Sequence, residues 1–139
     1  MMQRWTVMLV DDEAMVLQVH GRFFECMGHD VDMYTHPLKA AERFRDKHHA
    51  IDLLVTDFKM PDMDGLELVR TARANGYAGP VLMFTGYDQG AHVDTGARLG
   101  VDVMCKPVRY YELVEYVRHL QQRPGPFRGR RPGGLAPAQ

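Results

Sequence analysis

The stretch IDLLVTDFKMPDMDG, residues 51–65, decides the fold prediction for this chain of 139 residues. Its first half is an apolar run that ends at Asp57, and its second half is rich in the proline, glycine and acidic residues of turns. A short apolar run bounded by turn residues indicates a buried β-strand. Asp57 is therefore predicted to lie at the end of a buried strand, where the chain leaves the sheet.

Two other apolar runs also end in charged residues. The run TVMLV (residues 6–10) is followed by DDE (11–13), and VDVMC (101–105) is followed by KP (106–107). If these runs are parallel neighbours of the first, their carboxyl ends meet at one edge of the sheet, where ligands bind in such folds. The sequence then brings three acids, Asp11, Asp12 and Asp57, together with one lysine, Lys106.

Strand-like runs alternate with longer stretches of helical period along the chain. A weak strand signal covers residues 31–34, and residues 81–84 are predicted as the fourth strand. This alternation is typical of a parallel sheet covered by helices on both faces. We predict a flavodoxin-like (βα)5 fold over residues 1–122, an α/β domain whose five-stranded parallel sheet has the order 2-1-3-4-5.

Apolar residues spaced by three and four predict which helix positions are buried. The expected buried positions are Val16, Val19, Phe23 and Met27; Leu38, Ala41 and Phe44; Leu66, Val69 and Ala72; and, in a last helix of about residues 110–121, Leu113, Val114, Val117 and Leu120. A further helix is expected between Tyr87 and Leu99. Its two glycines and its β-branched residues make it the least stable of the set.

Composition narrows the class of protein. Cys26 and Cys105 are expected to be buried, reduced thiols, and the seven histidines, which show no zinc spacing, are expected to lie in solvent. The sequence has no signal-peptide pattern and no apolar stretch of the roughly 18 to 20 residues that a membrane span needs. We therefore expect a cytoplasmic protein without membrane insertion.

The charge is distributed unevenly along the chain. Residues 1–122 contain 13 Lys and Arg against 18 Asp and Glu, whereas residues 123–139 contain four arginines and no acid. The segment 123–139 is also rich in proline and glycine, so we expect a disordered tail. A solvated tail, or a segment that docks on a protein, is favoured over nucleic-acid binding because the arginines lie on no predicted helix.

The clustered residues suit phosphoryl chemistry. Asp11, Asp12 and Asp57 offer the oxygen ligands that Mg²⁺ prefers, and without a cation they would repel one another. Lys106 supplies a positive charge. Thr85, which directly follows the strand predicted at residues 81–84, supplies a hydroxyl donor. A carboxylate at such a site can act as a nucleophile on phosphorus and form an acyl phosphate.

Four motifs in register resemble the receiver domain of bacterial two-component response regulators, in its single-domain, chemotaxis-regulator-like form. The motifs are VDDE (10–13), VTDFKMPDMDG (55–65), FTG (84–86) and CKP (105–107). The resemblance covers about residues 5–122. It implies that Asp57 accepts a phosphoryl group from a histidine kinase or a histidine phosphotransfer protein.

The resemblance also implies roles for the neighbouring residues. Asp12, Asp57 and the backbone carbonyl of Lys59 would bind Mg²⁺ directly, with Asp11 acting through water. Thr85 and Lys106 would contact the phosphoryl group, and the peptide bond from Lys106 to the following proline would be cis.

The implied function is a switch that acts by binding, with no catalytic turnover beyond its own phosphorylation and slow dephosphorylation. Its signalling surface would be made by the fourth helix, fifth strand and fifth helix, and the protein would be a monomer or a phosphorylation-dependent dimer. The switch would act on a downstream protein target.

Three positions depart from or modify the family pattern. The family often has an aromatic residue three positions before the lysine, and here that position is Val103. Lys59 and Tyr87 occupy positions that influence the rate of acyl-phosphate hydrolysis in the family.

Two alternative functions compete with this one. The first is a receiver-like scaffold that is never phosphorylated, but a pure scaffold does not need the acid cluster and Lys106. The second is an aspartate-nucleophile phosphohydrolase, which needs an acid two residues after the nucleophile, where this chain has Lys59. Asp62 and Asp64 are assigned to the turn and to a helix N-cap.

Overall fold

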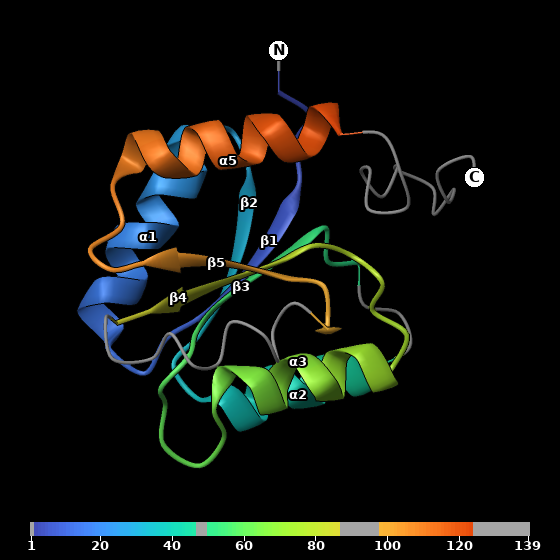
Figure 1. Ribbon diagram of the computed structural model, residues 1–139. Helices are drawn as coiled ribbons and strands as arrows, with labels where there is room; N and C mark the ends of the chain where they lie inside the picture. The colour runs from blue at the N-terminus through green and yellow to red at the C-terminus, as the bar shows by residue number, and fades with distance from the viewer. Residues whose placement is uncertain (1, 47–49, 87–97, 124–139) are drawn as a thin grey trace.

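A five-stranded parallel sheet organises the computed structural model of the chain, which describes residues 2–46, 50–86 and 98–123 (Figure 1). The strand order is β2-β1-β3-β4-β5, and all four neighbouring pairs are parallel. The strands are β1 (Thr6–Val10), β2 (Asp30–Tyr34), β3 (Leu53–Asp57), β4 (Val81–Thr85) and β5 (Val101–Cys105). The predicted fold class and strand order are confirmed.

Helices cover both faces of this sheet. The described residues contain α1 (Ala14–Cys26), α2 (Pro37–Arg45), α3 (Gly65–Ala74) and α5 (Tyr110–Gln122). Figure 1 shows α1 and α5 on one face of the sheet and α2 and α3 on the other. The helix expected between Tyr87 and Leu99 lies almost wholly outside the described residues, as does the expected disordered tail from Pro124 onward. None of the helices described here is long and apolar enough to cross a membrane.

The sheet separates two apolar cores. Met8, Phe44 and Leu68 belong to the core under α2 and α3, and Phe24 and Leu113 to the core under α1 and α5. Every residue of the central strands β3 and β4 is buried, because both faces of these strands are covered. Fully burying one large apolar side chain stabilises the fold by roughly 1.5–3 kcal/mol, so these cores hold the strand ends in place.

Helix ends are set by an N-cap acid, which the sequence predicts, and by two glycines. Asp64 is the N-cap of α3: its side chain accepts from the Glu67 N–H, and Glu67 accepts from the Asp64 N–H. Asp62 lies in the preceding turn with φ of 73°. Gly28 and Gly76 follow α1 and α3 with φ of 93° and 90°, a backbone conformation that glycine adopts without strain.

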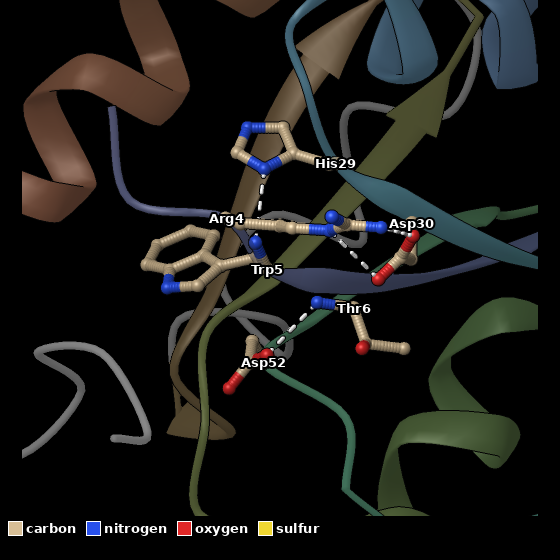
Figure 2. Close-up of polar contacts among 6 residues, drawn as sticks. All are labelled: Arg4, Trp5, Thr6, His29, Asp30 and Asp52. Carbon is tan, nitrogen blue, oxygen red and sulfur yellow. Dashed lines mark hydrogen bonds and ion pairs between the residues drawn. The ribbon is translucent and has the colours of Figure 1, made fainter. Parts of the chain in front are cut away.

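Side chains accept hydrogen bonds from the N–H groups of Thr6, the first residue of β1, and of Trp5, which precedes it (Figure 2). The Trp5 N–H donates to His29 Nδ1 at 3.0 Å, and the Thr6 N–H donates to Asp52 Oδ2 at 2.9 Å. Arg4 forms an exposed ion pair with Asp30 at 2.6 Å. The ring of His29 is buried, and that burial lowers its pKa, so the neutral ring can serve as an acceptor.

The predicted buried face of α1 is wrong by about one residue. The buried positions are Leu17, His20, Gly21 and Phe24, whereas Val19 is 50% exposed. Two of these residues, His20 and Gly21, are not apolar side chains. A prediction based on the spacing of apolar residues therefore does not assign them to the buried face. In α2 the expected Ala41 and Phe44 are buried, but Leu38 is 50% exposed.

Two expectations about polar and sulfur side chains are also wrong. Cys26 and Cys105 are both exposed, since Cys26 ends α1 and Cys105 ends the edge strand β5. His20 and His29, expected in solvent, are buried. His20 packs edge-on against the ring of Phe84, with ring centroids 5.0 Å apart. This aromatic contact lies between α1 and the sheet.

Candidate functional site

Three carboxylates meet at the carboxyl ends of β1 and β3. Asp11 and Asp12 follow β1, and Asp57 is the last residue of β3. The two strands are neighbours in register, with Val10 opposite Thr56. One ligand oxygen from each of the three acids lies within 4.8 Å of the others, so the predicted acid cluster is present.

Lys106 and Thr85 reach the same edge from β5 and β4. Lys106 Nζ lies 2.9 Å from Asp57 Oδ1 and 4.0 Å from Asp11 Oδ2. The Lys106 N–H donates to the backbone carbonyl of Thr85 at 2.8 Å, which ties the start of the loop after β5 to the end of β4. The Lys106–Pro107 peptide bond is cis, as the resemblance implies.

Burial sets the electrostatics of the cluster. It raises the pKa of Asp11 to about 6, although the Glu13 N–H, which donates to Asp11 Oδ1, opposes the rise. Burial also raises the pKa of Asp57, against the hydrogen bond and charge of Lys106. Burial by itself lowers the pKa of Lys106, but Asp57 outweighs it and leaves that pKa above its ordinary value. Lys106 thus only partly compensates the acids.

The donor set fits a hard divalent cation. Asp11 Oδ2 is buried and has no hydrogen-bond partner within the described part of the chain, an arrangement that costs free energy unless a ligand completes it. Asp12 is exposed beside two buried acids, so the cluster opens toward solvent on one side. Mg²⁺ takes one or two carboxylates and keeps several waters, which this half-open arrangement allows.

The raised pKa of Asp11 predicts how stability depends on pH when no divalent cation is present. Its folded pKa of about 6 exceeds the unfolded value of 3.8, so the folded state binds more protons between these values. Stability should therefore fall as the pH rises from about 4 to about 7, by on the order of 2 kcal/mol after allowance for solvent screening.

Urea unfolding in EDTA at pH 5 and pH 7 measures this dependence. Asp11→Asn should reduce the difference between the two pH values, and Mg²⁺ should reduce it in the unmodified chain. An equal pH dependence with and without the Asp11 carboxyl would contradict the prediction.

Two of the positions that the sequence singles out can be placed in the structure. Lys59 is exposed two residues after Asp57, in the loop that leaves β3. Val103 is partly buried and packs against the core under α2 and α3, so no aromatic ring stands at this position of β5. Tyr87 lies outside the described residues.

Gly65 belongs to the site although the sequence suggested only a helix start. Its N–H donates to the Phe58 carbonyl at 2.7 Å. A Cβ at this position would lie 2.5 Å from the backbone carbonyl oxygen of Asp57 and 3.1 Å from the Phe58 Cα. The first turn of α3 therefore packs directly on the backbone of the central acid. The only sequence signal for this contact is a glycine directly after the N-cap acid.

These elements define a class of protein: a flavodoxin-like domain with carboxylates and a lysine gathered at the carboxyl edge of its sheet. Residues 7–118 match the family described as "Response regulator receiver domain". The chain belongs to this family. Phosphorylation on an aspartate and Mg²⁺ binding at an acidic pocket are general properties of receiver domains.

Curated relatives extend the comparison. The chain is 36% identical over 118 residues to the transcriptional regulatory protein TrcR of Mycobacterium tuberculosis, an alignment that covers 84% of this chain and 45% of TrcR. It is 32% identical over 116 residues to the probable C4-dicarboxylate response regulator DctR of Priestia megaterium, covering 80% of this chain and 49% of DctR. The chain thus spans about half the length of these relatives.

Solved structures agree on the fold. A response regulator receiver domain protein from Clostridium thermocellum aligns with a TM-score of 0.77 at 22% identity, covering 83% of this chain and 92% of that one. The receiver domain of sensor histidine kinase PA1611 from Pseudomonas aeruginosa PAO1 aligns with a TM-score of 0.72 at 21% identity, covering 84% and 97%. That protein has a magnesium ion coordinated in its active site cleft.

Proposed function

We propose that this chain is a phosphorylation-controlled signalling switch that accepts a phosphoryl group on Asp57. The observation that carries the proposal is the ion pair of 2.9 Å between Lys106 Nζ and Asp57 Oδ1 inside the acid cluster. The ammonium already lies where a phosphoryl group attached to Asp57 would carry its charge. The donor would be a histidine kinase or a histidine phosphotransfer protein, the two classes that phosphorylate receiver domains.

The arrangement suggests how each residue takes part. Asp57 supplies the nucleophilic oxygen, and Lys106 pairs with negative charge that develops on the phosphoryl oxygens. Asp11, Asp12, Asp57 and the carbonyl of Lys59 would hold Mg²⁺. The bound cation would neutralise phosphoryl charge and offset the repulsion among the acids. Thr85 would donate its hydroxyl to a phosphoryl oxygen from the end of β4.

The output of such a switch is binding rather than turnover. Phosphorylation changes the charge at the edge of the sheet and so shifts an existing equilibrium of the segment that joins β4 to β5. The surface of β5 and α5, together with the fourth helix that the sequence predicts outside the described residues, would then contact the downstream protein, and the chain would act as a monomer or as a phosphorylation-dependent dimer. We place this activity in the cytoplasm.

Intact-protein mass spectrometry tests the proposal. The chain is incubated with acetyl phosphate or phosphoramidate, with Mg²⁺ or with EDTA. We expect a gain of one phosphoryl mass that requires Mg²⁺ and is removed by neutral hydroxylamine, which cleaves acyl phosphates but not the phosphoesters of serine or threonine.

Two results would count against the switch. No mass gain with either donor at millimolar Mg²⁺ would favour the scaffold that is never phosphorylated. A gain that survives hydroxylamine would place the phosphoryl group on a hydroxyl side chain instead of a carboxylate.

A further inference from the structure

A groove of about 460 Å³ runs between α5 and the edge strand β5, away from the acid cluster. Met104 and the ring of Tyr116 give it an apolar lining, and Asp102, Glu112 and Glu115 give it three carboxylates. Within the described residues, β5 pairs only with β4, so nothing in this part of the chain closes the outer side of the groove. The lining therefore combines an apolar floor with acidic walls.

The carboxylates of the groove have only weak or neutral partners. Asp102 accepts a hydrogen bond from the Tyr116 hydroxyl at 2.8 Å, which leaves its negative charge uncompensated by that contact. Glu115 pairs with Arg118 at 2.9 Å, but both side chains are more than half exposed. Such exposed pairs contribute little and exchange readily with other partners. A cationic ligand can therefore still gain from this surface.

The chain itself supplies a segment of matching chemistry. Arg123, the last described residue, follows α5 and lines the groove. The sequence that comes next is PGPFRGRR, residues 124–131, which holds three arginines, one aromatic ring and no acid. We propose that this segment docks in the groove between α5 and β5, with Phe127 on the apolar floor and its arginines on the acidic walls.

The length of the segment fits the groove. Glu112 and Arg123 stand at its two ends, and a helix rises about 1.5 Å per residue, so they are separated by roughly 16 Å along α5. An extended chain covers about 3.3 Å per residue, so the five residues from Arg123 to Arg128 span up to about 17 Å. Arg130 and Arg131 lie further along the chain and leave length for the reversal that this path requires.

The charges also select this segment over a second copy of the same surface. The groove is acidic, and the described domain as a whole has an excess of acidic residues, so two such grooves facing each other would place like charges together. The segment after Arg123 is the one strongly basic stretch of the sequence. Its tether to α5 keeps its local concentration near the groove high.

Docking would cover part of the surface that we propose for signalling, because β5 and α5 form both (Figure 1). The docking does not depend on phosphorylation of Asp57. The NMR experiment uses the unphosphorylated chain. A result that contradicts docking therefore does not contradict the proposed switch, and an absence of phosphorylation does not contradict docking.

Amide NMR spectra of the full chain test the proposal. The unmodified chain is compared with the triple variant Arg128→Gln, Arg130→Gln and Arg131→Gln, which keeps the length of the segment and removes its charge. We expect chemical-shift changes at residues 102–104 and 112–119, and none in α2 on the opposite face. Raising the salt concentration should move the same amides of the unmodified chain toward their positions in the variant.

The reciprocal substitution supplies the matched control. Glu115→Gln in the groove should shift the amides of Gly125 and of residues 127–131, whereas Glu25→Gln, which changes another exposed acid, on α1, should leave them unchanged. Unaltered groove amides in the triple variant would overturn the proposal. Shifts that grow with protein concentration would overturn it as well, because the occupant would then be a second copy of the chain.

Discussion

Asp57→Asn is expected to lose all phosphoryl uptake and, in the absence of Mg²⁺, to unfold at a higher temperature than the unmodified chain. The loss follows because an amide oxygen is a poor nucleophile toward phosphorus. The gain follows because burial disfavours the ionised Asp57, whose pKa is raised even with Lys106 2.9 Å away. Asparagine keeps the shape of the side chain and removes the buried charge.

The size and pH range of the gain follow from the same charge. We expect of the order of 1 kcal/mol at pH 7, or roughly 3–5 °C in Tm for a domain of this size. Lys106 loses its nearest partner but is 30% exposed, so water can replace it. Because a raised pKa means that the folded state keeps its proton at low pH, the gain should vanish below about pH 4, where the unmodified Asp57 is neutral too.

Thermal unfolding in EDTA at pH 7 and pH 4, together with intact mass after treatment with acetyl phosphate and Mg²⁺, measures both effects. Asp62→Asn is the matched control: Asp62 is an exposed acid of the same loop, and asparagine tolerates its φ of 73°. This control should take up phosphoryl groups normally and gain no stability. Phosphoryl uptake by Asp57→Asn, or a Tm below that of the unmodified chain at pH 7, would contradict the prediction.

The sheet and its acid cluster could be predicted because they depend on local patterns. Apolar runs that end in charged residues fix both the strands and the edge where their side chains gather, so Asp11, Asp57 and Lys106 could be assigned to one site from sequence. The helix starts and stops are equally local, as at Asp64 and Gly76, where one residue type satisfies the backbone.

Features that depend on contacts between distant residues could not be predicted in the same way. Gly21 is buried against β2, where the sulfur of Met33 lies 2.7 Å from the position that a Cβ would take, and no helical period reveals this contact. His29 is buried because its Nδ1 accepts the Trp5 N–H, 24 residues away in sequence. Cys105 is exposed because β5 is an edge strand, a property of the strand order and not of the run itself.

Gly65→Ala is expected to destabilise the chain by about 3 kcal/mol, or roughly 10 °C in Tm, and to slow phosphoryl uptake. The added Cβ would meet the Asp57 carbonyl oxygen at 2.5 Å and the Phe58 Cα at 3.1 Å. Both atoms are backbone, held by the Gly65 N–H bond to Phe58 and by the Phe58 N–H bond to Phe84. Relief of the clash must therefore move α3 or the end of β3 that carries Asp57.

Gly21→Ala separates this effect from a general intolerance of buried glycine. Its Cβ would come as close to a neighbour, 2.7 Å from Met33 Sδ, but that sulfur belongs to a flexible side chain that is 44% exposed and can move aside. Alanine also raises helix propensity inside α1 by up to about 1 kcal/mol, so Gly21→Ala should unfold near the temperature of the unmodified chain or above it. Thermal unfolding of both variants, with the rate of phosphoryl uptake, decides the matter: equal stability of the two would mean that α3 does not press on the backbone of Asp57.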